Sequence, residues 1–138
     1  MSALSEAIYD LMTGDATLVG LLATYRDGAA FFTTDPPPGD ATKPYGVSAG
    51  EVATSPWDTK TTEGREVYRD VRFYTDAGGS AVTVEALAER ARALLHRQTL
   101  IVDGFSVIVA ECSGPAQADE PDAYGRIVTI RIIMEETT

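Results

Sequence analysis

Residues 4–22 read LSEAIYDLMTGDATLVGLL, and this stretch predicts two short amphipathic helices at the start of the chain. The apolar side chains recur close to helical spacing, which places them on one face. Gly14 can end the first helix, and Asp15 can cap the second by accepting a backbone N–H. Because Glu6, Asp10 and Asp15 interrupt the apolar run, we expect no signal peptide here, and the segment stays on the mature protein.

Length and composition predict a single domain, residues 1–138, with an acidic surface. The apolar fraction is 44%, and no run approaches the length of a membrane span, so we expect no membrane partner. The net charge of −10 opposes binding to a nucleic-acid backbone, which needs clustered Lys and Arg. Cys112 is the only cysteine and allows no internal disulfide, which favours synthesis in a reducing cytoplasm.

The order of the remaining patterns predicts an α+β fold: an antiparallel sheet, one long helix packed on it, short N-terminal helices and a projecting loop or hairpin. Residues 65–75 alternate as a strand, with Val67, Val71 and Phe73 on one face. A helix is expected from Ser80 or Thr83, either of which can cap it, to about His96. Its apolar stripe consists of Val84, Leu87, Ala88, Ala91, Leu94 and Leu95.

Further strands are expected on either side of Asp103-Gly104, which is a two-residue hairpin signal, and over residues 126–134. Weaker strand patterns lie at 29–33 and 45–52. Three polar stretches are predicted as connections: the proline-rich 34–44, a projecting loop or hairpin tip over 53–64, and an acidic, irregular loop over 113–124.

No group of residues predicts catalysis, a cofactor or a metal. Cys112 and His96 are a conceivable nucleophile and base, but neither lies in a catalytic motif, and packing is the favoured role for the thiol. Asp119, Glu120 and Asp122 lack the spacing and glycine of a calcium loop, so a solvated loop is favoured. Residues 77–80 precede a helix but lack the Lys-Ser/Thr of a phosphate-binding loop.

The candidate functional features are instead those of an assembly protein. Trp57 lies in a polar loop, where it can serve as an interface anchor or fold back over the sheet edge, and both interpretations remain open. Tyr68, Arg72 and Tyr74 share the less apolar face of their strand, where they either cover the sheet or meet a neighbour. An open sheet also has edges, and a ring can satisfy them by strand addition between subunits.

The whole chain resembles the tail-completion, or tail terminator, proteins of long-tailed phages, which also occur in prophages and in phage-like gene transfer particles. The resemblance rests on the element order and on these phrases: LSEAIYDLMTGDATLVGLLA (4–23), PYGVSAGEV (44–52), VYRDVRFYT (67–75), ALLHRQTL (93–100), LIVDGFSVIV (100–109) and GRIVTIRIIMEE (125–136).

This resemblance implies a structural virion protein that forms a homohexameric ring on the last ring of the tail tube. Such a ring stops tube growth, presents a surface to the head–tail connector or stopper, and lets DNA pass through its channel without specific binding. The implied location is the head-proximal end of the tail, after synthesis in the host cytoplasm. The expected interface residues are Trp57, Pro36, Pro37, Pro38, Tyr68, Arg72, Tyr74, Asp119, Glu120 and Asp122.

Three alternatives stay open from the sequence. One is a head-completion or neck adaptor protein on the capsid side of the same joint. Another is a small cytoplasmic enzyme whose site combines Cys112, His96 and the acidic loop. The third is a regulatory binding module that uses Trp57.

Overall fold

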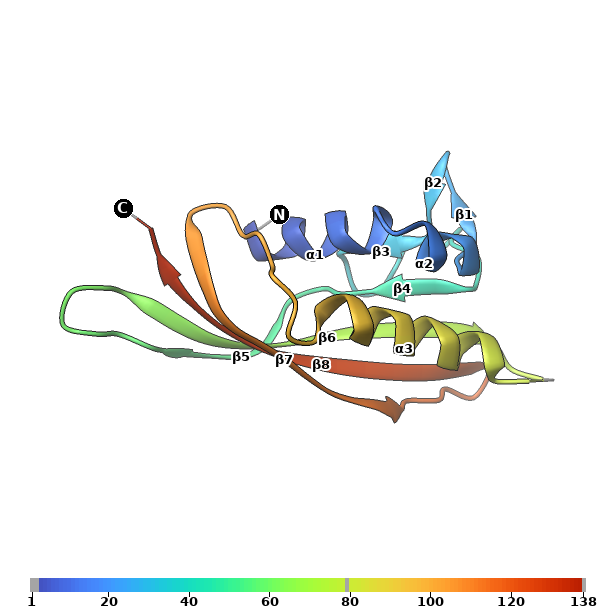
Figure 1. Ribbon diagram of the computed structural model, residues 1–138. Coiled ribbons are helices and arrows are strands. Elements are labelled where there is room, and N and C mark those ends of the chain that lie inside the picture. Colours follow the sequence, from blue (N-terminus) through green and yellow to red (C-terminus); the bar gives the residue numbers. More distant parts are fainter. Residues whose placement is uncertain (1–2, 79, 138) are drawn as a thin grey trace.

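A twisted sheet with helices on one face forms the framework of the protein in a computed structural model, which describes residues 3–78 and 80–137 (Figure 1). The α+β class expected from the sequence is confirmed. The elements in chain order are α1 (Ala3–Thr13), α2 (Ala16–Leu21), β1 (Thr24–Tyr25), β2 (Gly28–Ala29), β3 (Phe31–Phe32), β4 (Tyr45–Val47), β5 (Glu51–Pro56), β6 (Gly64–Asp76), α3 (Val82–Leu95), β7 (Phe105–Gln117) and β8 (Ala123–Glu136). None of the helices in this described part is long and apolar enough to cross a membrane.

The centre of the sheet is the antiparallel pair of β6 and β8, which runs from Gly64 opposite Glu135 to Asp76 opposite Ala123 without a register shift. β7 pairs with the other side of β8, and its register shifts twice. β4 and β5 both pair with the free side of β6, at its two ends, and β3 adds to β4 in parallel. β1 and β2 form a separate two-stranded ribbon.

The alternation of β6 decides which face is the core. Val67, Val71 and Phe73 are buried against the helices, as the sequence predicts. On β8, four residues in register with that face complete the sheet side of the core: Val128, Ile130, Ile132 and Met134. All three helices cover this face, and the other face carries none (Figure 1).

Asp15 joins two helices in the way its position suggests. Its carboxylate caps α2 by accepting a hydrogen bond from the Leu18 N–H at 2.9 Å. The same carboxylate accepts two hydrogen bonds from the guanidinium of Arg90 on α3, at 2.7 and 2.9 Å. These bonds hold the pKa of Asp15 below its usual value, with Arg90 as the main cause. The predicted N-terminal helix pair is thereby fastened to the long helix.

The long helix differs from its prediction at its start. It begins at Val82, and its N-cap residue is Ala81, whose side chain makes no capping hydrogen bond. Neither Ser80 nor Thr83 is therefore the N-cap. Ser80 still takes part, because its hydroxyl oxygen accepts a hydrogen bond from the Val82 N–H. The apolar stripe is buried as expected except at Leu94, which is only half-buried.

Three predicted boundaries were wrong. The 53–64 stretch contains most of β5, so only residues 57–63 form a turn; together, residues 51–64 make a projecting arm (Figure 1). The 113–124 stretch is mostly strand, because β7 continues to Gln117 and β8 begins at Ala123. Before Asp103-Gly104 there is only a single bridge, from Val102 to Phe105, instead of a strand.

Truncating Leu87, which is fully buried on α3, should strongly destabilise the protein. We expect Leu87→Ala to lower the free energy of unfolding by about 2–5 kcal/mol, because it removes buried methyl groups and leaves a cavity. Leu94→Ala, on the same helix but half-buried, is the matched control and should cost clearly less. Chemical denaturation measures both, and equal losses would contradict this orientation of α3.

Candidate interaction surface

The helix-free face of the sheet is the main candidate surface. It is built from alternate residues of the central pair, namely Glu66, Tyr68, Asp70, Arg72 and Tyr74 on β6 and Ile127, Thr129 and Arg131 on β8. Alternation along a strand points these side chains away from the core. The three β6 residues expected to share the less apolar face do share it.

Polar contacts organise the middle of this face. Arg131 pairs with Glu66 at 2.6 Å, and the Thr129 hydroxyl donates to Asp70 at 2.7 Å. Arg72 lies 3.5 Å from Asp70. Partly exposed pairs of this kind contribute little to stability, so their main effect is to fix the side chains of this face in place.

Aromatic residues form one end of the face. Tyr74 is 8% exposed and packs on Tyr45 of β4, with ring centroids 5.7 Å apart. Within this single chain Tyr74 covers the sheet, and it also lines the groove described next, so its predicted contact with a neighbour stays a prediction. Burial raises the pKa of Tyr45, and the nearby charges of Glu120, Asp122 and Asp35 raise it further. The surroundings of this ring pair are therefore acidic.

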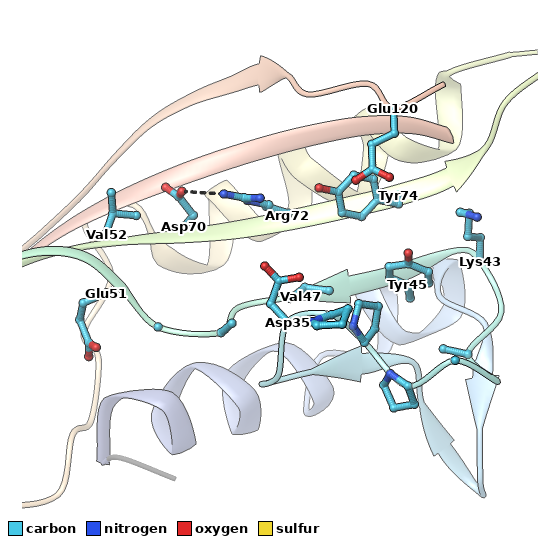
Figure 2. A pocket seen from close by; sticks show the side chains of 17 residues that line it. Asp35, Lys43, Tyr45, Val47, Glu51, Val52, Asp70, Arg72, Tyr74 and Glu120 are labelled. Carbon is cyan, nitrogen blue, oxygen red and sulfur yellow. Dashed lines mark ion pairs between the residues drawn. The ribbon is translucent and has the colours of Figure 1, made fainter. Parts of the chain in front are cut away.

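A groove of about 850 Å³ opens between this face and the proline-rich loop. Figure 2 shows Tyr45 and Tyr74 next to each other in its lining, with Lys43 and Glu120 toward one end and Glu51 and Val52 at the other. Among its lining residues are six of the predicted interface positions: Pro36, Pro37, Pro38, Arg72, Tyr74 and Glu120. The fold thus brings together residues that lie up to 84 positions apart in the sequence, from Pro36 to Glu120.

The other four predicted interface residues lie outside the groove lining. Trp57 is 43% exposed at the end of β5, where its N–H donates to the Gly64 carbonyl oxygen. Tyr68 lies opposite Arg131 on the helix-free face. Asp122 is exposed in the short turn before β8.

Asp119 has a structural role in that same turn. Its carboxylate accepts hydrogen bonds from the Gly125 N–H at 2.8 Å, from Arg126 at 3.0 Å and from Gln117. These contacts lower the pKa of Asp119, with the Gly125 bond as the main cause. The carboxylate therefore holds the end of β7 to the start of β8.

Cys112 and His96 do lie close together, but in an arrangement unlike that of a nucleophile and its base. The backbone N–H of Cys112 donates to His96 Nδ1 at 3.0 Å, so this nitrogen contacts the strand instead of the thiol. Burial raises the pKa of the Cys112 thiol to about 11, which keeps it protonated at neutral pH. Across residues 3–78 and 80–137, no three His, Cys, Asp or Glu side chains converge as a metal site would require.

Arg69 is the residue of greatest structural interest that the sequence reading passed over. It lies between Val67 and Val71 on the core face and is fully buried. Its Nε donates to the Ser48 hydroxyl and its Nη2 to the Ser48 carbonyl oxygen, both at 2.8 Å. Glu51 lies 3.6 Å away. Burial lowers the pKa of Arg69, and the Glu51 charge opposes this. The alternation of β6 puts residue 69 on the same face as Val67 and Val71, and this pattern was the signal that could have predicted a buried Arg69.

Comparisons with known proteins show which family the chain belongs to. The family model described as "Tail completion protein gp17" matches residues 6–135. The chain belongs to this family. A comparison with curated protein sequences gave no match.

The fold of this chain is also seen in a solved structure. A chain from the virion of a native gene transfer agent (GTA) particle superposes with a TM-score of 0.77 at 22% identity, covering 96% of this chain and 94% of that one. At this identity the likeness shows a shared fold. Together with the family match, it identifies the chain as a structural protein of a phage-type tail, as the sequence resemblance implied.

Removing the hydroxyl of Ser48 should destabilise this tail completion protein. Ser48→Ala leaves the Arg69 Nε buried without its acceptor, so we expect a loss of about 1–3 kcal/mol in the free energy of unfolding. Ala49→Ser, one residue further and exposed, should change it by less than about 0.5 kcal/mol. Thermal or urea denaturation measures both, and a neutral Ser48→Ala would mean that water replaces the lost contact.

Proposed function

We propose that six copies of the chain form a ring at the head-proximal end of a tail tube, where the ring ends tube growth and joins the tail to the head connector. The match of residues 6–135 to a tail completion family carries this proposal. A closed ring needs two unlike, complementary surfaces on each copy. The chain offers several unlike surfaces, since its arm, its groove and its two sheet edges all differ.

The distribution of charge supports a channel that DNA passes without being held. Of the 11 basic residues, eight already lie within 4.0 Å of a carboxylate: Arg26, Lys43, Arg65, Arg69, Arg72, Arg90, Arg126 and Arg131. Binding to DNA requires cations that are free to neutralise phosphates. A ring of such subunits repels the DNA backbone, so DNA can pass through the channel without binding to its wall.

The groove on the helix-free face is the surface that we assign to a neighbouring tail protein, either the tube protein or the connector. It combines proline and tyrosine side chains with the carboxylates of Asp35 and Glu120. Aromatic surfaces are typical anchors of interfaces, and the carboxylates select a basic partner. The protein acts in this proposal without catalysis and without a cofactor.

Deleting the gene should give tails of uncontrolled length that fail to join filled heads, because nothing then stops polymerisation of the tube. Electron microscopy of the particles measures both effects, and supplying the wild-type gene in trans is the control. Tails of normal length attached to heads would overturn the proposal. Normal tails beside heads that leak DNA would assign the chain to the neck adaptor role instead.

Ring formation by the isolated protein should increase with salt. Each copy carries a net charge of −10, so closing a ring brings like charges together, and salt screens this repulsion. We expect monomers at about 0.05 M salt and a growing fraction of rings toward about 0.5 M, where the Debye length is well below about 10 Å. Sedimentation velocity measures the distribution. Rings that dissociate as salt rises would show that ion pairs, and not apolar contacts, dominate the subunit interface.

A further inference from the structure

Four of the five large apolar side chains that remain exposed in the described part of the chain lie at two sheet edges, and the fifth, Val82, lies on α3. The five residues are Val52, Trp57, Val82, Ile101 and Ile108. Val52 (62% exposed) and Trp57 (43%) lie on the arm, and Ile101 (86%) and Ile108 (53%) lie beside β7. The strand pairings put β5 and β7 on opposite sides of the central pair. The chain therefore carries two separate apolar patches at opposite sheet edges.

Hydrogen bonds order the backbone of the arm around Trp57. The backbone N–H of Trp57 donates to the Gly64 carbonyl oxygen at 2.9 Å, and the Asp58 carboxylate accepts from the Gly64 N–H at 3.2 Å. Thr59 and Thr62 bond to each other across the turn. A loop whose backbone is already ordered loses less conformational entropy on binding. Every residue of β5 is nevertheless exposed, so the arm presents its surface to solvent.

A second groove, of about 540 Å³, lies along the β7 edge between residues 97–100 and 107–111. The Arg97 N–H donates to the Ala110 carbonyl oxygen at 2.7 Å, and the Cys112 N–H donates to His96. These two bonds occupy outward-facing backbone groups of β7, so this part of the edge is closed to an added strand. The groove therefore suits the docking of side chains from a partner.

We propose that the arm of one copy seats in the β7-edge groove of the next copy, with Trp57 packing against Ile108 in the groove and Ile101 beside it. This inference rests on the proposed ring and names its subunit contact. Two unlike patches on opposite edges give a head-to-tail contact, which is the kind that closes into a ring.

Charge favours the same pairing. The arm (51–64) carries Glu51, Asp58 and Glu63 against Lys60, but its tip over residues 57–62 contains only Asp58 and Lys60 and is neutral on a chain of net charge −10. A second copy therefore meets little repulsion at the tip. Arg97 lines the groove, and in the described structure it has no carboxylate within 4.0 Å, while the exposed Glu63 at the arm supplies one.

Trp57 is the only tryptophan, so its fluorescence reports directly on the arm. On assembly of the wild-type ring, we expect the emission maximum to move to shorter wavelength as the indole leaves water. Trp57→Ala should raise the protein concentration needed for rings at least tenfold. Val82→Ala, which truncates an even more exposed apolar residue on α3, should leave that concentration unchanged. An unshifted emission maximum in assembled rings would overturn the proposal.

Cysteine cross-linking tests the direction of the contact. In a Cys112→Ser background, a chain carrying both Ser55→Cys on the arm and Thr99→Cys in the groove should form disulfide-linked ladders on oxidation. Neither single cysteine variant should form a dimer, because a head-to-tail contact never brings two identical positions together. A pair with Val82→Cys in place of Thr99→Cys is the control and should give no ladder.

The outcomes separate this inference from the proposed function. Dimers from Ser55→Cys alone would show arm-to-arm pairing and overturn the inference. Rings with normal mass but without the ladder would also overturn it, while the ring itself would stand. Tubes that are never capped by the protein would remove the proposed function instead.

Discussion

The uninterrupted pairing of β6 with β8 is the constraint on which the rest of the structure depends. Over this pair, alternate residues face the helices or the open side, and a shift of one residue would exchange the two sets. Val67, Val71 and Phe73 would then be exposed, while Asp70 and Arg72 would enter the core. The hydrophobic pattern therefore fixes the register, and the register in turn builds the helix-free face with its groove.

Arg69 is the exception to that pattern, and its surroundings explain why the exception is tolerated. A buried guanidinium without partners would be very costly, but the bonds to the hydroxyl and the carbonyl oxygen of Ser48 and the nearby Glu51 carboxylate offset its desolvation. The same contacts fasten the segment between β4 and β5 to β6. Arg69 thus fixes where the arm leaves the sheet, which links a buried cation to an exposed surface.

The sequence was sufficient for elements whose pattern is local. Both N-terminal helices, the cap at Asp15, β6, α3 and β8 follow from periodicity within each segment. It failed where pairing decides the structure: β5 reads as a polar loop, and it becomes a strand only because β6 lies beside it. Six interface candidates do meet in one groove, but their proximity depends on tertiary contacts that no local pattern encodes.

Edges and charge together limit how such a subunit can associate. A sheet with open edges invites unlimited addition of strands, and a net charge of −10 opposes any contact between copies. Here His96 and Arg97 occupy outward groups of β7, while Pro115 and two register shifts interrupt that strand. What remains for self-association is the arm, whose tip is neutral and carries the exposed Trp57. Association through one small apolar contact against general repulsion is weak in solution, and it becomes favourable where a template holds the copies side by side. The role proposed here requires that balance, because the proposed ring has to form at the end of a tube and not before the copies reach it.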